Sequence, residues 1–321
     1  MSAALEAARA EGPKTHRLFG YPLHGSYASF LHNTITRLVD VPRKYSFMES
    51  TDMDAFLKYL RSDECAGSAV TMPHKVAICQ HLDELTEDGR NIGACNTVII
   101  RKGPNGERKL VGHNTDSVGV RESILRADDS HVKSGKIRPG AVFGAGGACR
   151  AAVYALTQWL NCSPIYVVNR DDAEVDQFIA DFKRMTSDSF KPELVHVKTV
   201  EQADQLDAPA YIVSAVPDFP PTTAEEKRAR AVSMTLLNKD VKGTIVEMCY
   251  HPKIWTTLAQ LAKDAGWGVI TGDAPMIWQG VEQQALWLGL DKSDLPCDEI
   301  VDTVARQVAS DKETGSQPPL E

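Results

Sequence analysis

The chain has 321 residues, of which 43% are hydrophobic and 24% charged, and its 35 basic and 43 acidic side chains give a formal net charge of −8. This length is typical of two domains of ~100–200 residues each, and the composition excludes a coiled coil or a wholly disordered chain. The acidic balance argues against nucleic acid and anionic membranes as partners, because Lys and Arg supply most of the binding to both.

The N-terminus and the cysteines predict where the protein works. Residues 1–13 contain acidic side chains and no apolar run of the signal-peptide kind, and no stretch of ~18 apolar residues occurs anywhere. The seven cysteines form no C-x-x-C pair, and the nine histidines show no paired ligand spacing. We therefore expect a cytoplasmic protein with no metal site and no membrane span.

In the first third of the chain, strand-like and helix-length segments alternate, which predicts an α/β domain. Pro73 suits the first position of a helix, and this places Lys75 in the first turn, where a cation opposes the helix dipole. Such a lysine suggests a functional task, although a solvated surface lysine is the plain alternative. The expected strands are residues 17–23, 44–48, 68–72, 96–101 and 109–112, and the expected helices are 29–39, 53–60, one opening at Pro73, one near 84–90 and one after Asp116.

After a charged stretch at residues 128–138, six β-branched segments alternate with helices. This pattern predicts a doubly wound, Rossmann-like dinucleotide-binding sheet. The last two helices have no strand partner left and are expected to fold back onto the first domain. We expect domains of residues 1–127 with 277–310 and of residues 128–276, followed by a disordered tail at 311–321. The six strands are residues 141–143, 165–168, 194–197, 211–214, 244–248 and 268–270, and the last helices are 277–290 and 298–309.

A short apolar strand, a glycine turn and a helix start occur together at residues 140–150. Gly144 and Gly146 permit positive φ and let backbone N–H groups approach a pyrophosphate at the helix N-terminus. The third position of the G-x-G-x-x-G pattern is Cys149, so the pattern is imperfect. Residues 169–172, of sequence Asn-Arg-Asp-Asp, follow the next strand, where a ribose would lie. A tight turn without a ligand is the plain alternative.

Residues 114–116, of sequence Asn-Thr-Asp, precede another expected helix. An Asx or Thr residue in this place is by default an N-cap. The chain has neither G-x-S-x-G nor G-x-x-x-x-G-K-[ST], so hydrolase and phosphoryl-transfer interpretations lack their usual motifs.

Seen together and in this order, these segments resemble the shikimate dehydrogenase family, including its quinate dehydrogenase branch. The resemblance covers residues 17–290 and implies an N-terminal substrate domain, a C-terminal nicotinamide-binding domain and an active site in the cleft between them. The matching segments are Gly20-Tyr-Pro-Leu with Ser26 and His32-Asn33, Val70-Thr71-Met-Pro73-His-Lys75, Gly93-Ala-Cys-Asn96-Thr97, Asn114-Thr115-Asp116-Ser-Val-Gly119, Gly144-Ala-Gly-Gly-Ala148, Asn169-Arg170, Glu247-Met248-Cys-Tyr250 and Gln279.

The resemblance implies a role for each matching residue. Lys75 and Asp116 would be the catalytic pair, because oxidation of a secondary alcohol needs a base for the hydroxyl proton while hydride leaves for the nicotinamide. A carboxylate favours the ammonium form of the lysine and a cationic nicotinamide disfavours it, so the pair can be tuned either way. Substrate would be bound by Ser26 and Tyr250 at the carboxylate and by Thr71, Asn96 and Gln279 at hydroxyls, and the cofactor by Gly144, Ala145, Gly146, Gly147, Ala148, Asn169, Arg170, Asp171, Asp172 and Met248.

Two departures from the family pattern concern the substrate. Ala28 stands where the family commonly has a second hydroxyl residue after the first serine, and Ala69 stands where it commonly has Asn. Losing one hydrogen bond to a carboxylate costs ~1.5–3 kcal/mol, a factor of roughly 10–100 in affinity. The activity class is therefore better predicted than the substrate.

A third departure concerns the cofactor. Arg170 suits the 2′-phosphate of NADP, whereas Asp171, Asp172 and, farther on, Glu174 suit the ribose hydroxyl of NAD. At ~5 Å and an effective dielectric of ~20, each unit charge pair is worth ~3 kcal/mol, so two acids can outweigh one arginine. We expect NAD to be favoured, with NADP possible.

These observations predict an NAD(P)-dependent dehydrogenase of quinate, shikimate or a related hydroxylated ring carboxylate, working as a monomer or homodimer. A non-catalytic sensor that binds a metabolite on the same fold is the alternative. Intact Lys75 and Asp116 count against the sensor, because a sensor need not keep a proton-transfer pair.

Overall fold

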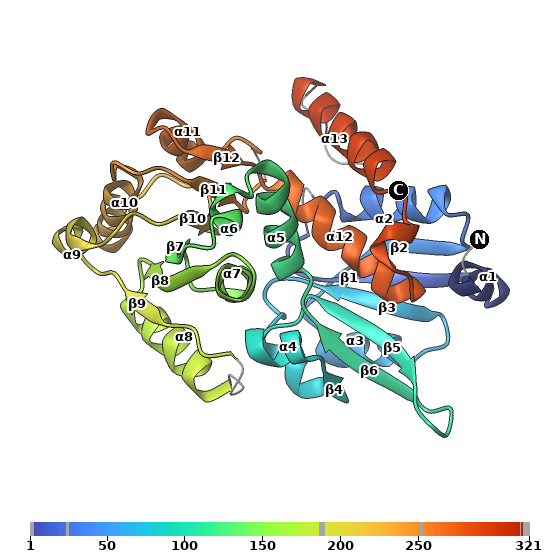
Figure 1. Cartoon of the computed structure of the whole chain (residues 1–321). Coiled ribbons are helices and arrows are strands. Elements are labelled where there is room, and N and C mark those ends of the chain that lie inside the picture. The colour runs from blue at the N-terminus through green and yellow to red at the C-terminus, as the bar shows by residue number, and fades with distance from the viewer. Residues whose placement is uncertain (1–2, 24–25, 186–189, 251–252, 315, 317–321) are drawn as a thin grey trace. The chain divides into compact units, whose positions relative to one another are not determined.

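The structure is a computed structural model that describes residues 3–23, 26–185, 190–250, 253–314 and 316 (Figure 1). Contacts divide the chain into two compact units. Unit 1 comprises Met1–Gly89, Ala94–Thr115 and Met276–Glu321, and unit 2 comprises Arg90–Gly93 and Asp116–Pro275. Each unit is built on one six-stranded sheet, which confirms the predicted α/β class.

The sheet of unit 1 has the strand order β2-β1-β3-β5-β6-β4. Strand β1 is parallel to both β2 and β3, so Leu18 lies opposite Phe47 on one side and Ala69 on the other, whereas β5 runs antiparallel to β3 and β6. The strands are β1 (Lys14–Gly20), β2 (Arg43–Glu49), β3 (Cys65–Val70), β4 (Glu84–Leu85), β5 (Thr97–Lys102) and β6 (Arg108–His113), and the helices are α1 (Ala3–Ala10), α2 (Ala28–Leu38), α3 (Met53–Leu60), η1 (Ala77–His81), α4 (Glu87–Ile92), α12 (Asp273–Leu288), η2 (Lys292–Asp294) and α13 (Cys297–Thr314), of which α4 and α12 cross a limit of the unit.

The C-terminal helices return to this first sheet, as predicted. On α12, Trp287 Nε1 donates to Val98 O at 3.0 Å. Gly67 leaves room for this indole, since a Cβ there would lie 2.3 Å from a ring carbon of Trp287. Gly280 has the same function toward α2, because its Cβ would lie 2.3 Å from Leu31. Helix α12 is therefore a packed part of the unit that carries most of the predicted substrate residues.

Unit 2 has an all-parallel sheet of order β12-β11-β10-β7-β8-β9. This is the 3-2-1-4-5-6 order of a dinucleotide-binding fold, with the order reversing between β7 and β10. The strands are β7 (Arg138–Phe143), β8 (Cys162–Val168), β9 (Leu194–His196), β10 (Tyr211–Ser214), β11 (Thr244–Glu247) and β12 (Gly268–Ile270), and the helices are α5 (Asp116–Ala127), α6 (Ser130–Lys133), α7 (Gly147–Gln158), α8 (Asp172–Met185), α9 (Val200–Gln205), α10 (Ala224–Leu237) and α11 (Thr257–Asp264).

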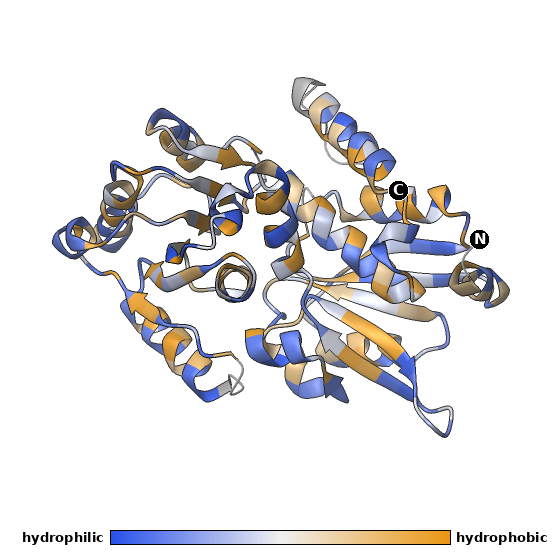
Figure 2. Cartoon of the chain, viewed as in Figure 1, coloured by the Kyte–Doolittle hydropathy of each residue, from blue (hydrophilic) through white to orange (hydrophobic). Residues whose placement is uncertain are grey.

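Hydropathy explains both cores. Figure 2 shows apolar residues along the strands and an apolar and a hydrophilic side on helices such as α8. In unit 1, Phe19 of β1 stacks on Phe56 of α3 with ring centroids 4.1 Å apart. In unit 2, Phe143 and Ile212 are fully buried with apolar residues of α10 and α11. All six predicted strands of this second sheet are present.

Helices α1, α5 and α13 differ from the expected organisation. Helix α1 was not predicted; it is fixed by Arg9, whose side chain donates to Val39 O and Asp40 O at 2.8 and 2.7 Å. Helix α5 packs on α7, β11 and β12 and so lies in unit 2, whereas the predicted division puts it in the first domain. The prediction of a disordered tail is wrong for residues 311–314, because α13 continues through Thr314.

Candidate active site

Lys75 lies in a hydrogen-bonded turn directly after β3. Thr71 N donates to Phe19 O at 2.8 Å, which attaches the start of the turn to β1. Cys95 N donates to Lys75 O at 2.7 Å, so the segment before β5 holds the backbone of the lysine. Lys75 is therefore fixed at the carboxyl ends of the parallel strands β1 and β3.

The predicted helix opening at Pro73 is wrong. The Met72–Pro73 peptide is cis, residues 72–76 form turns and a bend, and the first helical residues are those of the 3₁₀-helix η1. The carbonyl of Lys75 accepts from Cys95 N, and Cys79 N donates to Val76 O at 3.3 Å instead. Tertiary hydrogen bonds, and not a helix start, decide where this lysine lies, so the helix-dipole argument does not apply.

Asn96 is the centre of a buried polar network in unit 1. Its Nδ2 donates to Thr115 Oγ1 (3.0 Å) and Gln279 Oε1 (3.3 Å), and its Oδ1 accepts from Thr115 N (2.8 Å) and Thr97 Oγ1 (2.6 Å). Asn96 and Gln279 are 183 residues apart in the chain, and both were predicted substrate residues. The structure brings them into contact.

Gln283, one helical turn after Gln279, supports this network. Its Nε2 donates to Asn96 O at 3.2 Å and to Thr97 Oγ1 at 2.9 Å, and its Oε1 lies 3.1 Å from His32 Nε2. Desolvation by burial lowers the pKa of His32 to about 3, so the ring is neutral at physiological pH. Because the amide oxygen can only accept, the single ring proton belongs on Nε2.

The other predicted substrate residues divide between the two units. Ser26 lies before α2, where its Oγ accepts from the N–H of buried Ala28 at 3.3 Å. Thr71 shares the turn that holds Lys75. Tyr250 and Met248 follow β11 in unit 2, where Met248 N donates to Ser214 O at 2.8 Å.

Asp116 is the first residue of α5 and is buried. The residue before it uses its side chain elsewhere, because Thr115 Oγ1 lies 3.3 Å from Asn96 Oδ1 and 3.2 Å from Gln279 Oε1. The amide of Asn114 donates to Ala94 O at 2.7 Å. Ala94, Asn96 and Gln279 lie in unit 1, whereas Asp116 belongs to unit 2, so the segment carries more than a helix cap.

The glycine turn of unit 2 fits a dinucleotide phosphate. Gly144 follows β7 with φ of +110°, and a Cβ there would lie 3.0 Å from Cys149 Sγ. Gly146 is the N-cap of α7, and no atom lies within 4 Å of where its Cβ would be. An open N-terminus of a 12-residue helix leaves backbone N–H groups and the positive end of the dipole available to an anion. Ala145, Gly147 and Ala148 complete this turn and the start of α7.

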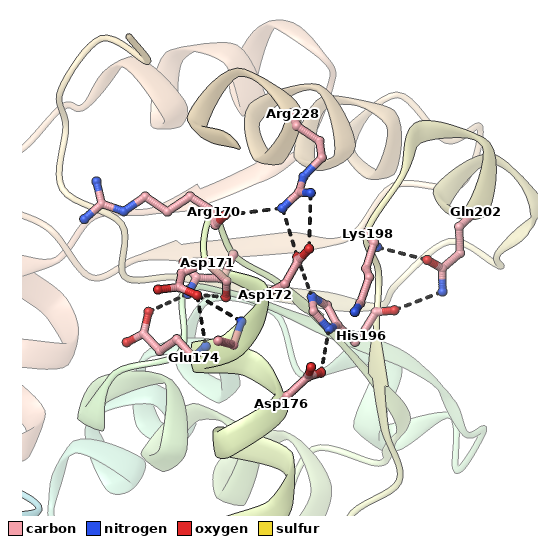
Figure 3. Close-up of polar contacts among 11 residues, drawn as sticks. Arg170, Asp171, Asp172, Glu174, Asp176, His196, Lys198, Gln202 and Arg228 are labelled. Atoms are coloured by element: carbon pink, nitrogen blue, oxygen red, sulfur yellow. Dashed lines mark hydrogen bonds and ion pairs between the residues drawn. The ribbon is translucent and has the colours of Figure 1, made fainter. Parts of the chain in front are cut away.

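Charged side chains crowd the turn after β8, where a ribose would lie (Figure 3). Asp171 Oδ1 accepts from the N–H groups of Ala173 and Glu174 at 2.9 and 3.2 Å, so this carboxylate caps α8. Asn169 Nδ2 donates to Glu174 Oε2 at 2.6 Å. Two of the predicted cofactor residues therefore also build the turn itself.

Helix α10 supplies partners for the remaining two predicted residues of this turn. Arg170 Nη1 lies 2.6 Å from Glu226 Oε1. Arg228 donates to both oxygens of Asp172, at 2.9 and 3.2 Å, and to Arg170 O at 3.3 Å. Figure 3 shows the Arg228 side chain reaching from its helix to Asp172. The local sequence around residue 170 contains no sign of these partners.

A buried carboxyl, Glu247, ends β11. Its oxygens accept from Cys249 N at 3.1 Å and from Thr256 Oγ1 at 3.2 Å, and the side chain is 1% exposed. Desolvation raises the pKa of Glu247 to about 7, while the same hydrogen bonds favour the ionised form. The carboxyl therefore fixes both ends of the loop that carries Met248 and Tyr250.

Two general features of the described residues bear on other kinds of site. No three His, Cys, Asp or Glu side chains are grouped there to hold a metal ion. None of the helices that the structure describes is both long and apolar enough to cross a membrane.

Comparison with known proteins identifies the family of this chain. Residues 18–98 match the model of the shikimate dehydrogenase substrate binding domain. A quinate dehydrogenase from Emericella nidulans is 43% identical over 288 residues, which cover 85% of this chain and 87% of that protein. The chain belongs to the shikimate and quinate dehydrogenase family.

Solved structures of shikimate and quinate dehydrogenases share the fold. The dehydroquinate dehydratase and shikimate dehydrogenase part of S. pombe AroM is 26% identical with a TM-score of 0.71, over 94% of this chain and 56% of that one. The quinate dehydrogenase from Corynebacterium glutamicum in complex with NAD is 23% identical with a TM-score of 0.73, over 92% and 99% of the two chains. The predicted two-domain fold of the family is thus confirmed.

Within this family fold, the sequence missed four residues that shape the candidate sites. Gln283 lies four positions after Gln279 on the same helix face, so helical spacing could have found it. Glu247 lies inside the matching segment at residues 247–250, but its burial is a property of the folded sheet. Glu226 and Arg228 are 56 residues from their partners, and no local pattern connects them.

Proposed function

We propose that this chain catalyses the reversible oxidation of a ring hydroxyl of quinate with NAD, with shikimate as the next candidate substrate. The chain is an NAD(P)-dependent oxidoreductase of the shikimate and quinate dehydrogenase family. Its 43% identity to a quinate dehydrogenase supports quinate as the first substrate to test. Ala28, in place of a hydroxyl residue, supports a carboxylate end that differs from the common shikimate site.

The buried network around Asn96 carries the proposal for substrate binding. Asn96 and Gln279 hold each other's amides, and Thr115 engages both, so their orientations are set before any ligand arrives. A polyol ring is distinguished by where its hydroxyls meet fixed donors and acceptors, because an unpaired buried polar group costs ~1–3 kcal/mol. Thr71, beside Lys75, and Ser26 would complete the hydroxyl and carboxylate contacts.

Lys75 and Asp116 are the proposed proton-transfer pair. Lys75 would take the hydroxyl proton during oxidation and return it during reduction, and Asp116 would favour the protonated lysine. A bound nicotinamide supplies the hydride acceptor. The backbone of Lys75, held by Cys95 N, keeps the amine on a fixed turn, which reduces the entropy lost when substrate is positioned.

NAD is the proposed cofactor, with NADP as a weaker alternative. The open glycine turn at Gly146 supports binding of the pyrophosphate. At the ribose turn, one arginine and three acids are local, namely Arg170, Asp171, Asp172 and Glu174, and this negative balance disfavours a 2′-phosphate.

A substrate panel run with both nicotinamides tests the proposal. Quinate, shikimate and two related ring acids are each offered with NAD and with NADP, and formation of reduced nicotinamide is followed by absorbance. We expect the highest kcat/KM for quinate with NAD. No reduction with any ring acid would overturn the enzymatic proposal and leave the sensor, which no comparison supports.

The cellular setting is also proposed. All seven cysteines are free thiols, which supports a reducing compartment such as the cytoplasm. We propose a monomer or homodimer, which sedimentation of the purified chain at two concentrations distinguishes.

A further inference from the structure

Helix α10 places two opposite charges on the turn that follows β8. Glu226 pairs with Arg170 at 2.6 Å, and Arg228 pairs with Asp172 at 2.9 Å. Both helix residues are near the N-terminal end of α10, which begins at Ala224 with a capping box formed by Thr223 and Glu226. The charges that a ribose 2′ group would meet are therefore set by two elements and not by the turn alone.

Glu226 forms an ion pair with Arg170, the arginine expected to suit a 2′-phosphate. The N–H groups of Thr222 and Thr223 donate to this carboxylate, and together with Arg170 they lower the pKa of Glu226 to about 2. The carboxylate is thus ionised at any physiological pH. Arg170 has a permanent anionic partner before a cofactor binds.

Arg228 forms an ion pair with Asp172, one of the acids of the turn. Its guanidinium donates to both oxygens of Asp172, the bidentate geometry of a strong charge pair. His196 Nε2 lies 3.3 Å from the same carboxylate, and Asp176 contacts the other ring nitrogen of His196 at 3.3 Å. Asp171 is used as a helix cap, so Asp172 is the acid of this turn whose charge depends most on a side chain from elsewhere.

We propose that Arg228 is a specificity-determining residue for the cofactor, which acts by neutralising Asp172 and so allows the site to accept a 2′-phosphate as well as a free ribose hydroxyl. This inference rests on the proposed dinucleotide site and deepens it. Without Arg228, the carboxylate of Asp172 keeps only His196 beside it, and its negative charge at the ribose turn repels the 2′-phosphate of NADP. NAD carries no charge there, so its binding changes little.

The pair is well suited to an experiment because it is not a main support of the fold. The side chains of Arg228 and Asp172 are each 37% exposed, and ion pairs at that exposure contribute little to stability. Arg230 provides a matched control: it is an arginine on the same helix, half-buried, and two positions farther on, so it points to a different side.

The test measures direct binding of two cofactor fragments by isothermal titration calorimetry. ADP-ribose and 2′-phospho-ADP-ribose are titrated into wild type, Arg228→Gln, Arg230→Gln and the double variant Arg228→Gln with Asp172→Asn. We expect Arg228→Gln to weaken 2′-phospho-ADP-ribose about tenfold and ADP-ribose less than threefold. Arg230→Gln should change neither, and the double variant should regain the lost affinity, since residue 172 then carries no negative charge.

Each outcome decides between explanations. Equal weakening of both ligands would show that Arg228 only holds the turn together, and a double variant that stays weak would show that Arg228 does not act through Asp172; either result overturns the inference. If Arg228→Gln does not fold, Asp172→Asn alone decides, and the inference requires it to tighten 2′-phospho-ADP-ribose severalfold. If wild type binds neither fragment, the proposed dinucleotide site itself fails.

Discussion

Replacing Glu247 by Gln is expected to stabilise the protein at neutral and alkaline pH. The carboxyl is buried at the end of β11, where it accepts hydrogen bonds from Cys249 N and Thr256 Oγ1. Gln has the same length and can keep both contacts, with its oxygen toward Cys249 N and its amide toward the threonine hydroxyl. The substitution therefore removes the charge and leaves the packing of the loop.

The magnitude follows from the pKa of Glu247, which burial raises from 4.5 to about 7. Between these values the native state keeps a proton that the unfolded state has released, so the free energy of unfolding falls as the pH rises through this window. Above about pH 7 both states are ionised and the loss is complete. At ~1.4 kcal/mol per pKa unit, the free energy of unfolding of the wild type at pH 8 is lower than that of the Gln variant by up to about 3 kcal/mol.

Urea unfolding at several pH values measures this difference. We expect the two proteins to have nearly the same stability at pH 5 and the variant to be more stable by about 1–3 kcal/mol at pH 8. Glu299→Gln, which removes an exposed carboxylate of α13, controls for the loss of one negative charge. Parallel stability curves for wild type and Glu247→Gln across this range would refute the argument from burial.

The remaining predictions concern the substrate side. Lys75→Met should fold normally and lose ~10²–10⁴-fold in turnover, the usual size of a lost general acid–base group, and turnover within threefold of wild type would contradict the mechanism. Gln283→Leu takes the amide partner from buried His32 Nε2 and one of two donors from Asn96 O, which keeps Val70 N, and should lower stability by about 1–3 kcal/mol while raising KM, measured by urea unfolding and steady-state kinetics. Ala28→Ser should lower the KM for shikimate up to roughly tenfold, whereas lost activity in a folded variant would mean that the alanine makes room for the substrate.

Features that depend on local spacing could be predicted from the sequence. The parallel sheet of unit 2 follows from six short β-branched runs, and the glycine turn follows from the position of Gly144 and Gly146 after the first of them. That Asn96 and Gln279 would serve one substrate site was predicted through the family resemblance alone, because no periodicity connects residues 183 positions apart, and their direct contact was not predicted. Their roles toward substrate stay predictions.

Features that depend on tertiary partners could not be predicted in this way. The turn at Lys75 reads as a helix start because Pro73 suits one, yet the lysine carbonyl is bonded by Cys95 N. Helix α1 is only eight residues long, and it depends on the hydrogen bonds that Arg9 donates to Val39 O and Asp40 O. In each case a hydrogen bond from a distant segment outweighs a local preference of less than ~1 kcal/mol per residue.

The ribose turn shows how a correct charge sum can hide the contact that matters. One basic and three acidic side chains in the turn sum to −2, and adding one acid and one arginine from α10 leaves the sum at −2. The electrostatic field at a distance from the turn is thus unchanged, while Asp172 is neutralised by Arg228.

Ionic strength separates these two effects. Raising it from ~0.01 to ~0.1 M shortens the screening length from ~30 to ~10 Å, which removes the distant field and spares contacts of a few ångströms. We therefore expect the wild-type preference for NAD over NADP to fall over this range. The ratio of the affinities of Arg228→Gln and wild type for 2′-phospho-ADP-ribose should change little. If that ratio falls to one as salt rises, Asp172 acts through the distant field and its pairing with Arg228 does not decide the cofactor.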